Sequence, residues 1–305
     1  MHAEGETMKK LLFVYNPHSG KGTISQSLSD IICLLTEHGC EVTVHPTSQQ
    51  GDGERYIAMN AASYDIVVTS GGDGMLHEMF SGLDKAQKPV KCGYIPSGTV
   101  NDFASSLGIS KVPGEAAATV ANGRFRKLDA GVFNGQIFSY VAAFGMFTKV
   151  SYATDQRMKN AFGAAAYFVE VLKSLDPKVF RESVVHARIK FGEHEYEDDF
   201  IFGMAGNTLS VGTLKGIIPH SASMDDGLLD GVFIKVPKSL TDLDRIRGAL
   251  ASQDLDIPEI IYASAPSFEI KLDRETEWTL DGEYGGSCDK AVINVKEKAV
   301  EIAVP

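Results

Sequence analysis

The chain has 305 residues, of which 44% are hydrophobic, and a formal net charge of −11. This length suits two ordinary domains, and the acidic balance argues against nonspecific nucleic-acid binding, which needs a basic surface. No apolar run approaches the length of a membrane-spanning helix, and the first residues do not resemble a secretory signal. The four scattered cysteines indicate neither a zinc site nor a disulfide framework, so we expect a cytoplasmic protein.

The first part of the sequence alternates between strand and helix patterns. The expected strands are 11–15, 41–45, 64–69 and 91–95, and the expected helices lie between about 24 and 39 and near 54–62, 75–83, 101–107 and 114–122. Such alternation is typical of parallel βαβ units. It predicts a three-layer α/β domain over residues 8–127.

After residue 127 the pattern becomes mainly antiparallel β. Asn134-Gly135 separates two apolar runs and predicts a tight hairpin. Further strands are expected around 185–191 and at 199–204, 228–236, 266–272 and 276–281, with helices near 155–175 and 239–251. The last strands, near 291–304, either close this sheet or return to the first domain. We expect a β-sandwich over residues 128–290, whose edge strands would permit a homodimer.

The segment SGGDGMLHE, residues 70–78, follows a buried strand and opens a helix. Its three glycines let backbone amides approach an anion, and the helix N-terminus favours phosphate. Asp73 would hold magnesium or orient the loop. A plain turn is the alternative, because the chain has five Asp-Gly pairs.

Two more loops follow parallel strands, so all three should meet at one edge of the sheet. NPHSGKG, residues 16–22, departs from the Walker A pattern but offers backbone amides and Lys21. PSGTVNDFA, residues 96–104, contains Asn101 and Asp102, either of which could merely cap the next helix. Three such loops on one edge favour a nucleotide-binding crevice.

Two later segments contain carboxylates that are candidates for cation binding or for proton transfer. GNT at 206–208 is followed by MDDGLLD at 224–230, where Asp226 either binds a divalent cation or lies in a solvated turn. LDGE at 280–283 ends an alternating strand; its carboxylate either accepts the proton of an attacking hydroxyl or simply belongs to a β-turn.

Together GGDG, PSGTxNDFA, GNT…DDGLLD and LDGE resemble the catalytic domain of the diacylglycerol kinase family, which includes sphingosine and ceramide kinases. The resemblance runs from about residue 11 to 285. It implies a lipid kinase that uses ATP and Mg²⁺ to phosphorylate the hydroxyl of diacylglycerol or a similar lipid alcohol at the membrane surface. It also implies a phosphofructokinase/NAD kinase-like first domain to which residues 291–305 return.

The resemblance carries over to individual residues. It implies nucleotide contacts from Asn16, Pro17, His18, Ser19, Gly20, Lys21, Thr47, Gly71, Gly72, Asp73, Gly74, Met75, Leu76, His77, Thr99 and Asp102. It implies a magnesium site at Ser223, Asp226 and Leu228, with either a structural or a catalytic role. Glu283 would accept the proton, with Asp281 beside it, and Asp73 would organise the phosphates and metal. Lys21 and Lys159 resemble basic positions near the cleft.

Three positions depart from the family pattern. Met75 and His77 replace the usual Thr and Asn, and Ser105 stands where a basic residue is frequent. These departures keep two alternatives open: a kinase of soluble substrates similar to NAD kinase, and a nucleotide- or lipid-binding regulator with weak catalysis.

Overall fold

The structure is a computed structural model that describes residues 8–98, 101–146, 183–207, 210–211, 214–215 and 223–305. The chain divides into two compact units: unit 1 comprises Met1–Leu128 with Lys298–Pro305, and unit 2 comprises Asp129–Glu297. It has a mixed α/β fold with an extensive antiparallel sheet, which confirms the predicted change in pattern along the chain.

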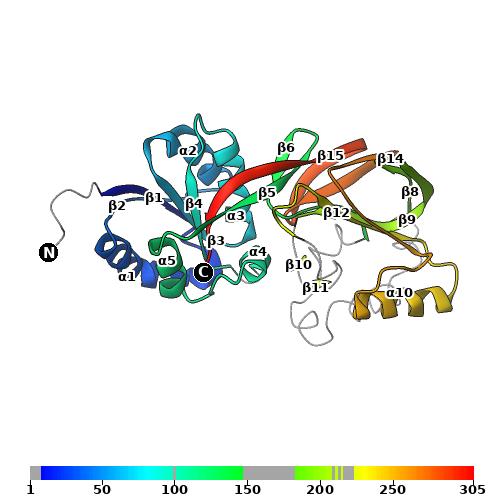
Figure 1. Ribbon diagram of the computed structural model, residues 1–305, viewed down its shortest axis with the longest axis horizontal. Helices are drawn as coiled ribbons and strands as arrows, with labels where there is room; N and C mark the ends of the chain where they lie inside the picture. Colours follow the sequence, from blue (N-terminus) through cyan, green and yellow to red (C-terminus); the bar gives the residue numbers. More distant parts are fainter. Residues whose placement is uncertain (1–7, 99–100, 147–182, 208–209, 212–213, 216–222) are drawn as a thin grey trace. The chain divides into compact units, whose positions relative to one another are not determined.

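Unit 1 contains a parallel sheet in the order β15-β4-β3-β1-β2. Its elements are β1 (Lys9–Tyr15), a 3₁₀ turn (Ser19–Gly22), α1 (Thr23–Glu37), β2 (Cys40–Pro46), α2 (Asp52–Asn60), a 3₁₀ turn (Ala61–Ser63), β3 (Ile66–Gly71), α3 (Asp73–Asp84), β4 (Lys91–Pro96), α4 (Asp102–Ser106) and α5 (Pro113–Ala121). Figure 1 shows α1 and α5 on one side of this sheet and α2 and α3 on the other. Because helices cover both faces, β3 is buried along its whole length.

Two strands run from one unit into the other. They are β5 (Phe125–Phe133) and β15 (Glu283–Ala303). The end of β15 lies parallel to β4, with Glu301 opposite Lys91 and Ile302 opposite Cys92. The end of the last strand therefore belongs to the parallel sheet of unit 1.

In the described part of unit 2, neighbouring strands pair antiparallel. The elements are β6 (Gln136–Phe138), β7 (Val141–Gly145), β8 (Val185–Phe191), β9 (His194–Gly206), β10 (Ser210–Val211), β11 (Leu214–Lys215), β12 (Leu229–Lys235), α10 (Leu240–Ser252), β13 (Ile260–Ala265) and β14 (Ser267–Leu280), with β5 and β15. The predicted hairpin is confirmed, because Asn134 and Gly135 adopt the positive φ of a tight turn. The helix predicted near 155–175 lies outside the described residues.

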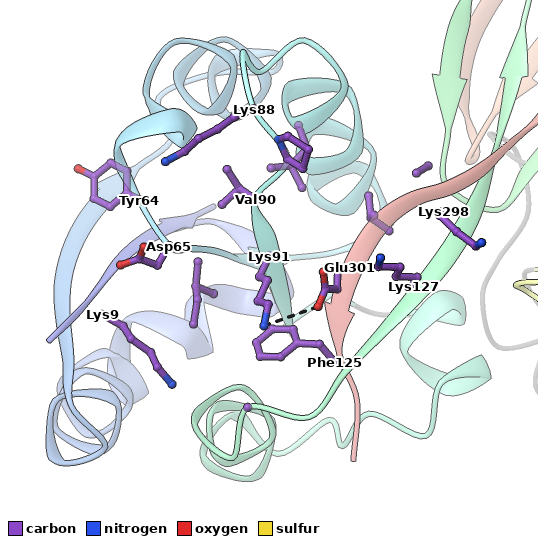
Figure 2. A pocket seen from close by; sticks show the side chains of 16 residues that line it. Lys9, Tyr64, Asp65, Lys88, Val90, Lys91, Phe125, Lys127, Lys298 and Glu301 are labelled. Carbon is purple, nitrogen blue, oxygen red and sulfur yellow. Dashed lines mark ion pairs between the residues drawn. The ribbon is translucent and has the colours of Figure 1, made fainter. Parts of the chain in front are cut away.

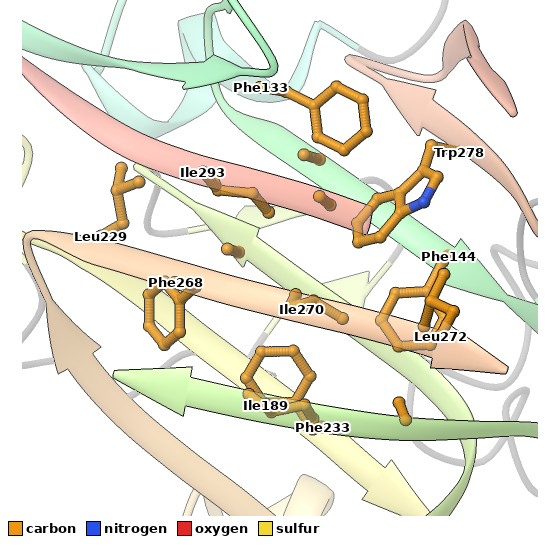
Figure 3. Packing of buried hydrophobic residues seen from close by; sticks show 14 of the residues in the cluster. Phe133, Phe144, Ile189, Leu229, Phe233, Phe268, Ile270, Leu272, Trp278 and Ile293 are labelled. Carbon is orange, nitrogen blue, oxygen red and sulfur yellow. The ribbon is translucent and has the colours of Figure 1, made fainter. Parts of the chain in front are cut away.

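The core of unit 2 gathers buried aromatic and aliphatic side chains from most of these strands, as Figure 3 shows. Trp278 on β14 is fully buried between Phe133 and Phe144, with ring centroids 4.8 Å from each. Aromatic pairs at this spacing add to the free energy gained from burial alone. This core fixes the hairpin that carries the LDGE motif, since β14 ends at Leu280 and β15 begins at Glu283.

Candidate functional site

Four loops of unit 1 leave the same edge of its parallel sheet. In the strand register, Tyr15 lies opposite both Pro46 and Ser70, and Gly71 lies opposite Pro96. These residues are the carboxyl ends of β1, β2, β3 and β4, or next to them. Open α/β sheets bind their ligands in the crevice outside this edge.

Backbone hydrogen bonds hold the first two loops to the sheet. The Asn16 amide donates to the Ser70 carbonyl at 2.9 Å, and the Asn16 side chain accepts from the His18 amide at 2.9 Å. The Thr47 amide and hydroxyl both donate to the Tyr15 carbonyl, at 2.9 and 3.3 Å. The geometry of 16–19 is therefore fixed locally, independently of any ligand.

The GGDG and PSGT loops touch through their glycines. The Gly71 carbonyl accepts from the amides of Ser97 and Gly98, at 2.8 and 3.1 Å. A Cβ added to Gly98 would lie 2.4 Å from the Gly72 Cα, a distance that no side chain could occupy without moving the backbone. α3 begins immediately after Gly72, and no side chain caps its N-terminus. Its first amides therefore provide partial positive charge at this edge of the sheet.

Asn101 joins these two loops, a role that the sequence interpretation did not assign. It is 1% exposed and has φ 56°, a left-handed conformation that Asn tolerates better than most residues. Its amide side chain accepts from the Gly98 amide and the Tyr94 hydroxyl, at 3.0 and 3.2 Å, and donates to the Gly98 carbonyl at 2.7 Å. Its backbone amide donates to the Asp73 carboxylate at 3.2 Å. Asp73 is thus held at the first turn of α3, half-buried.

The residues that follow Asp73 in α3 point in different directions. Met75 and Leu76 are buried, and the amides of both donate to the Gly72 carbonyl. The Met75 methyl group fills the space beside Gly53 on α2, where a Cβ would lie 2.4 Å away. Met75 therefore serves packing between α2 and α3, which explains why an apolar residue fits there, while His77 is half-buried.

Glu78, a further residue that sequence reasoning missed, links α3 to the loop that contains Thr47. Its carboxylate accepts from the backbone amides of Gly51 and Gly53, both at 2.8 Å, and of Glu54 at 3.3 Å. These amides belong to the start of α2, which has no side-chain cap of its own. An anionic acceptor is favourable at a helix N-terminus.

Asp52 also stabilises the loop that contains Thr47. Its carboxylate accepts from the Ser48 amide and hydroxyl, at 2.9 and 3.1 Å, and from Arg55 at 2.7 Å. The Ser48 backbone hydrogen bond, with further contributions from Arg55, the Ser48 hydroxyl and His45, lowers the pKa of Asp52 to about 2. The carboxylate is therefore ionised at neutral pH.

Some predicted positions cannot be placed. Thr99 and Lys159 lie outside the described residues, as do the side chains of Lys21 and Asp102.

In unit 2 the LDGE motif forms a two-residue hairpin turn. Asp281 and Gly282 have φ of 53° and 85°, which is the pattern of a type I′ turn. The Asp281 carboxylate is buried and accepts from the backbone amides of Ser139, Tyr140 and Val141, at 2.7, 2.9 and 3.1 Å. Asp281 therefore ties the hairpin to the start of β7.

Glu283, by contrast, is exposed at the first position of β15. It lies directly opposite Leu280 in the register, so the turn fixes its backbone. The motif thus contains one carboxylate that is used structurally and one that faces solvent.

The DDGLLD loop contains Asp226 and Leu228, two of the three residues predicted to hold magnesium, and Ser223 lies just before it. The Asp226 carboxylate is exposed and accepts from the Leu228 amide at 3.1 Å, while the Ser223 hydroxyl donates to Asp225 at 2.7 Å. Among the described residues, no group of three or more His, Cys, Asp or Glu gathers as metal ligands. One carboxylate with neighbouring hydroxyl and carbonyl oxygens fits a magnesium ion that keeps several water ligands.

Buried polar residues hold the DDGLLD loop in place by hydrogen bonds. The Asp129 carboxylate accepts from the Gly227 amide at 2.7 Å. Asn207 is fully buried and its side chain donates to the carbonyls of Asp129 and Met224, at 2.6 and 3.2 Å. The GNT and DDGLLD motifs, which are distant in sequence, are therefore joined inside unit 2.

No described helix is both long and apolar enough to cross a membrane.

Comparisons with known proteins agree on one family. The model of the diacylglycerol kinase catalytic domain matches residues 10–133. A diacylglycerol kinase of Staphylococcus haemolyticus is 31% identical over 96% of this chain and 87% of its own length. A diacylglycerol kinase of Bacillus subtilis is 30% identical over 97% of this chain and 99% of its own length.

Solved structures share the fold. A diacylglycerol kinase structure from Bacillus anthracis matches with a TM-score of 0.78 and 23% identity, over 99% of this chain and 98% of that one. Another structure from the same strain gives a TM-score of 0.83 at 24% identity, over 100% of this chain and 98% of that one.

Proposed function

Because this chain belongs to the diacylglycerol kinase family, we propose that it transfers the γ-phosphate of ATP to the hydroxyl of a lipid alcohol, diacylglycerol or a similar lipid. The observation that carries this proposal is the contact between Gly72 and Gly98, which brings two glycine loops and a helix N-terminus together at one sheet edge. Such an edge suits the phosphates of a nucleotide.

The nucleotide would lie across the loops of unit 1. Residues 16–20 and 71–74 are assigned to the contact with its phosphates, with Thr47 and Thr99 as further contacts. Magnesium would neutralise phosphate charge when bound, and Asp73 is the residue of unit 1 that would hold it. In unit 2, Ser223, Asp226 and Leu228 would hold a magnesium ion of their own.

In the proposed reaction, Glu283 accepts the proton of the lipid hydroxyl. The resulting oxygen forms a bond to the γ-phosphorus, the bond from that phosphorus to the bridging β–γ oxygen breaks, and ADP leaves. The exposure of Glu283 and its fixed backbone support this role. Asp281 makes its hydrogen bonds to backbone amides, so we assign it a positioning role.

We also propose a division of labour between the two parts of the chain. Residues 8–127 with about 291–305 would form the ATP-binding domain, similar in layout to phosphofructokinases and NAD kinases. Residues 128–290 would form a β-sandwich that binds the lipid. The enzyme would be cytoplasmic and act peripherally at the membrane surface, and edge strands such as β13 would permit a homodimer.

A lipid kinase assay tests this function. The purified protein is incubated with ATP, magnesium and mixed micelles that carry diacylglycerol, phosphatidylglycerol, a polyprenol or a sphingoid base. Glu283→Gln should lower turnover by about 10²–10⁴-fold, the usual contribution of a general base. Glu277→Gln, which changes an exposed glutamate on β14 of the same hairpin, should leave turnover unchanged.

Two other outcomes would reject the proposal. Phosphorylation of NAD without lipid would identify a kinase of soluble substrates. ATP binding without any phosphorylated product would identify a nucleotide-binding regulator.

A further inference from the structure

Unit 1 contains a pocket of about 690 Å³ at the amino-terminal edge of its parallel sheet, opposite the edge of the nucleotide loops. Lys9 begins β1, Ile66 begins β3 and Lys91 begins β4, and all three line the pocket (Figure 2). The described residues that line it include none that we assign to nucleotide, magnesium or proton transfer. A ligand in this pocket would form a second site.

Lysine dominates the charge of this pocket, although the whole chain has a net charge of −11. Its lining contains two carboxylates, Asp65 and Glu301, and five lysines, so five minus two gives a local net charge of +3. The lysines are Lys9, Lys88, Lys91, Lys127 and Lys298. They come from separate places in the sequence, and Figure 2 labels all five among the side chains that line the pocket.

The two carboxylates of the pocket already have partners. Glu301 pairs with Lys91 at 3.6 Å, and Lys91 also lies over the Phe125 ring, 4.6 Å from its centroid. The Asp65 carboxylate accepts from the backbone amide of Lys10 at 2.9 Å. They are therefore poorly placed to neutralise the remaining lysines.

Among the described residues, three of these lysines have no carboxylate within ion-pair distance. Within the described part of the chain, Lys9, Lys88 and Lys127 form no ion pair. Like charges around a concave surface raise the local potential and attract an anion. Tyr64, Val90 and Phe125 give the same pocket apolar and aromatic walls.

We propose that this pocket binds a phosphate monoester whose organic part is apolar. A monoester carries a charge of about −1.5 to −2 at neutral pH, which matches several lysines better than a singly charged carboxylate does. Lysine binds phosphate as a point charge, without the planar geometry that arginine requires. The monoester is either a small soluble molecule or the headgroup of a lipid. This inference does not depend on the proposed kinase activity.

The first experiment measures binding of phenyl phosphate by titration calorimetry, with phenol as the uncharged comparison. The pocket variant combines Lys9→Gln, Lys88→Gln and Lys127→Gln. The control variant combines Lys190→Gln, Lys238→Gln and Lys271→Gln, three exposed lysines of unit 2 that change the net charge equally. Because all six side chains are exposed, both variants should keep the unfolding midpoint of the parent protein.

A second arm separates the two sources of the monoester. Sedimentation with phosphatidylcholine vesicles that contain phosphatidate, a lipid phosphate monoester, is compared with sedimentation with vesicles that contain phosphatidylglycerol, a diester. Capture by phosphatidate vesicles in the absence of phenyl phosphate binding would identify a lipid headgroup as the ligand. Phenyl phosphate binding without vesicle capture would identify a soluble ligand.

The expected result in either arm is that the pocket variant binds the monoester at least tenfold more weakly than the parent, whereas the control variant stays within twofold. Binding should also weaken as salt concentration rises. Equal binding by the parent and the pocket variant, or no monoester binding by the parent in either arm, would overturn the proposal.

Discussion

The two units hold their motifs in different ways. In unit 1 the GGDG and PSGT motifs touch through bare backbone, where Gly98 approaches Gly72; the buried Asn101 side chain braces this contact, and the helix that follows has no side-chain cap. In unit 2 the motifs are held by buried polar side chains: Asp281 binds three backbone amides, and Asn207 joins two carbonyls. The glycines of the unit 1 motifs therefore shape the candidate site directly. The polar residues Asp281 and Asn207 of unit 2 instead stabilise the fold that positions the motifs around them.

The largest expected effect is that of Asp281→Ala on the stability of unit 2. The substitution leaves the amides of Ser139, Tyr140 and Val141 without their acceptor, so we expect a loss of about 3–5 kcal/mol in the free energy of unfolding. Urea unfolding measures it, with Asp289→Ala as the control at an exposed aspartate of β15. Parent-like stability together with lost turnover would instead make Asp281 catalytic.

Gly98→Ala tests the backbone contact in unit 1. Its Cβ would force the two loops apart, which should cost about 1–3 kcal/mol of stability and weaken nucleotide binding. Gly114→Ala is the matched control, because a Cβ at this position in α5 meets nothing within 4 Å. Equal nucleotide affinities of the two variants would mean that the close approach is irrelevant to the site.

The lowered pKa of Asp52 predicts that the difference in stability between the parent and Asp52→Asn depends on pH. Because its pKa in the folded protein is lowered to about 2, the ionised carboxylate stabilises the fold above the pKa of the unfolded chain, about 3.9. The contribution, about 2 kcal/mol, is lost as pH falls from about 4 towards 2. Unfolding of the parent and of Asp52→Asn should therefore differ most at neutral pH and converge in acid. A gap that stays constant down to about pH 2 would contradict the assignment.

The smallest expected effect is that of Glu78→Gln. Glutamine retains one acceptor oxygen, so the start of α2 should lose about 1 kcal/mol of stabilisation, and ATP affinity should fall a few-fold as the Thr47 loop loosens. Glu54→Gln, which removes a charge from the same helix N-terminus together with an ion pair to Lys85, is the control for charge. Unchanged ATP affinity in a destabilised Glu78→Gln variant would limit this residue to capping.

Local patterns made most of the fold predictable. The strand expected at 11–15 is β1, and Asn134-Gly135 forms the predicted hairpin, because both signals depend on neighbours in sequence. β13 was missed, since IIYASA is short and has little alternation. β14 is one strand where two were expected: the charged stretch Asp273–Glu275 resembles a turn, but it lies within an irregularity of the strand register.

The candidate site was predictable to a similar extent. Motif order indicated which loops meet at the sheet edge, yet Asn101 and Glu78 were not assigned their roles. The Asn101 backbone amide donates to the Asp73 carboxylate, 28 positions earlier in the chain. Glu78 caps a helix 24 to 27 positions earlier in the chain. Such contacts depend on how helices pack, which periodicity in one sequence does not reveal.

The pairing of the last strand with β4 has a consequence for synthesis. Residues 301 and 302 complete the parallel sheet that begins at Lys9, yet they leave the ribosome only after all of unit 2 has been made. Until these residues are made, one edge of β4 in the nascent unit 1 has no paired strand, so chaperones and other chains can bind it. A fragment that stops at Leu128 would remain in that state, so we expect it to aggregate unless residues 298–305 are supplied.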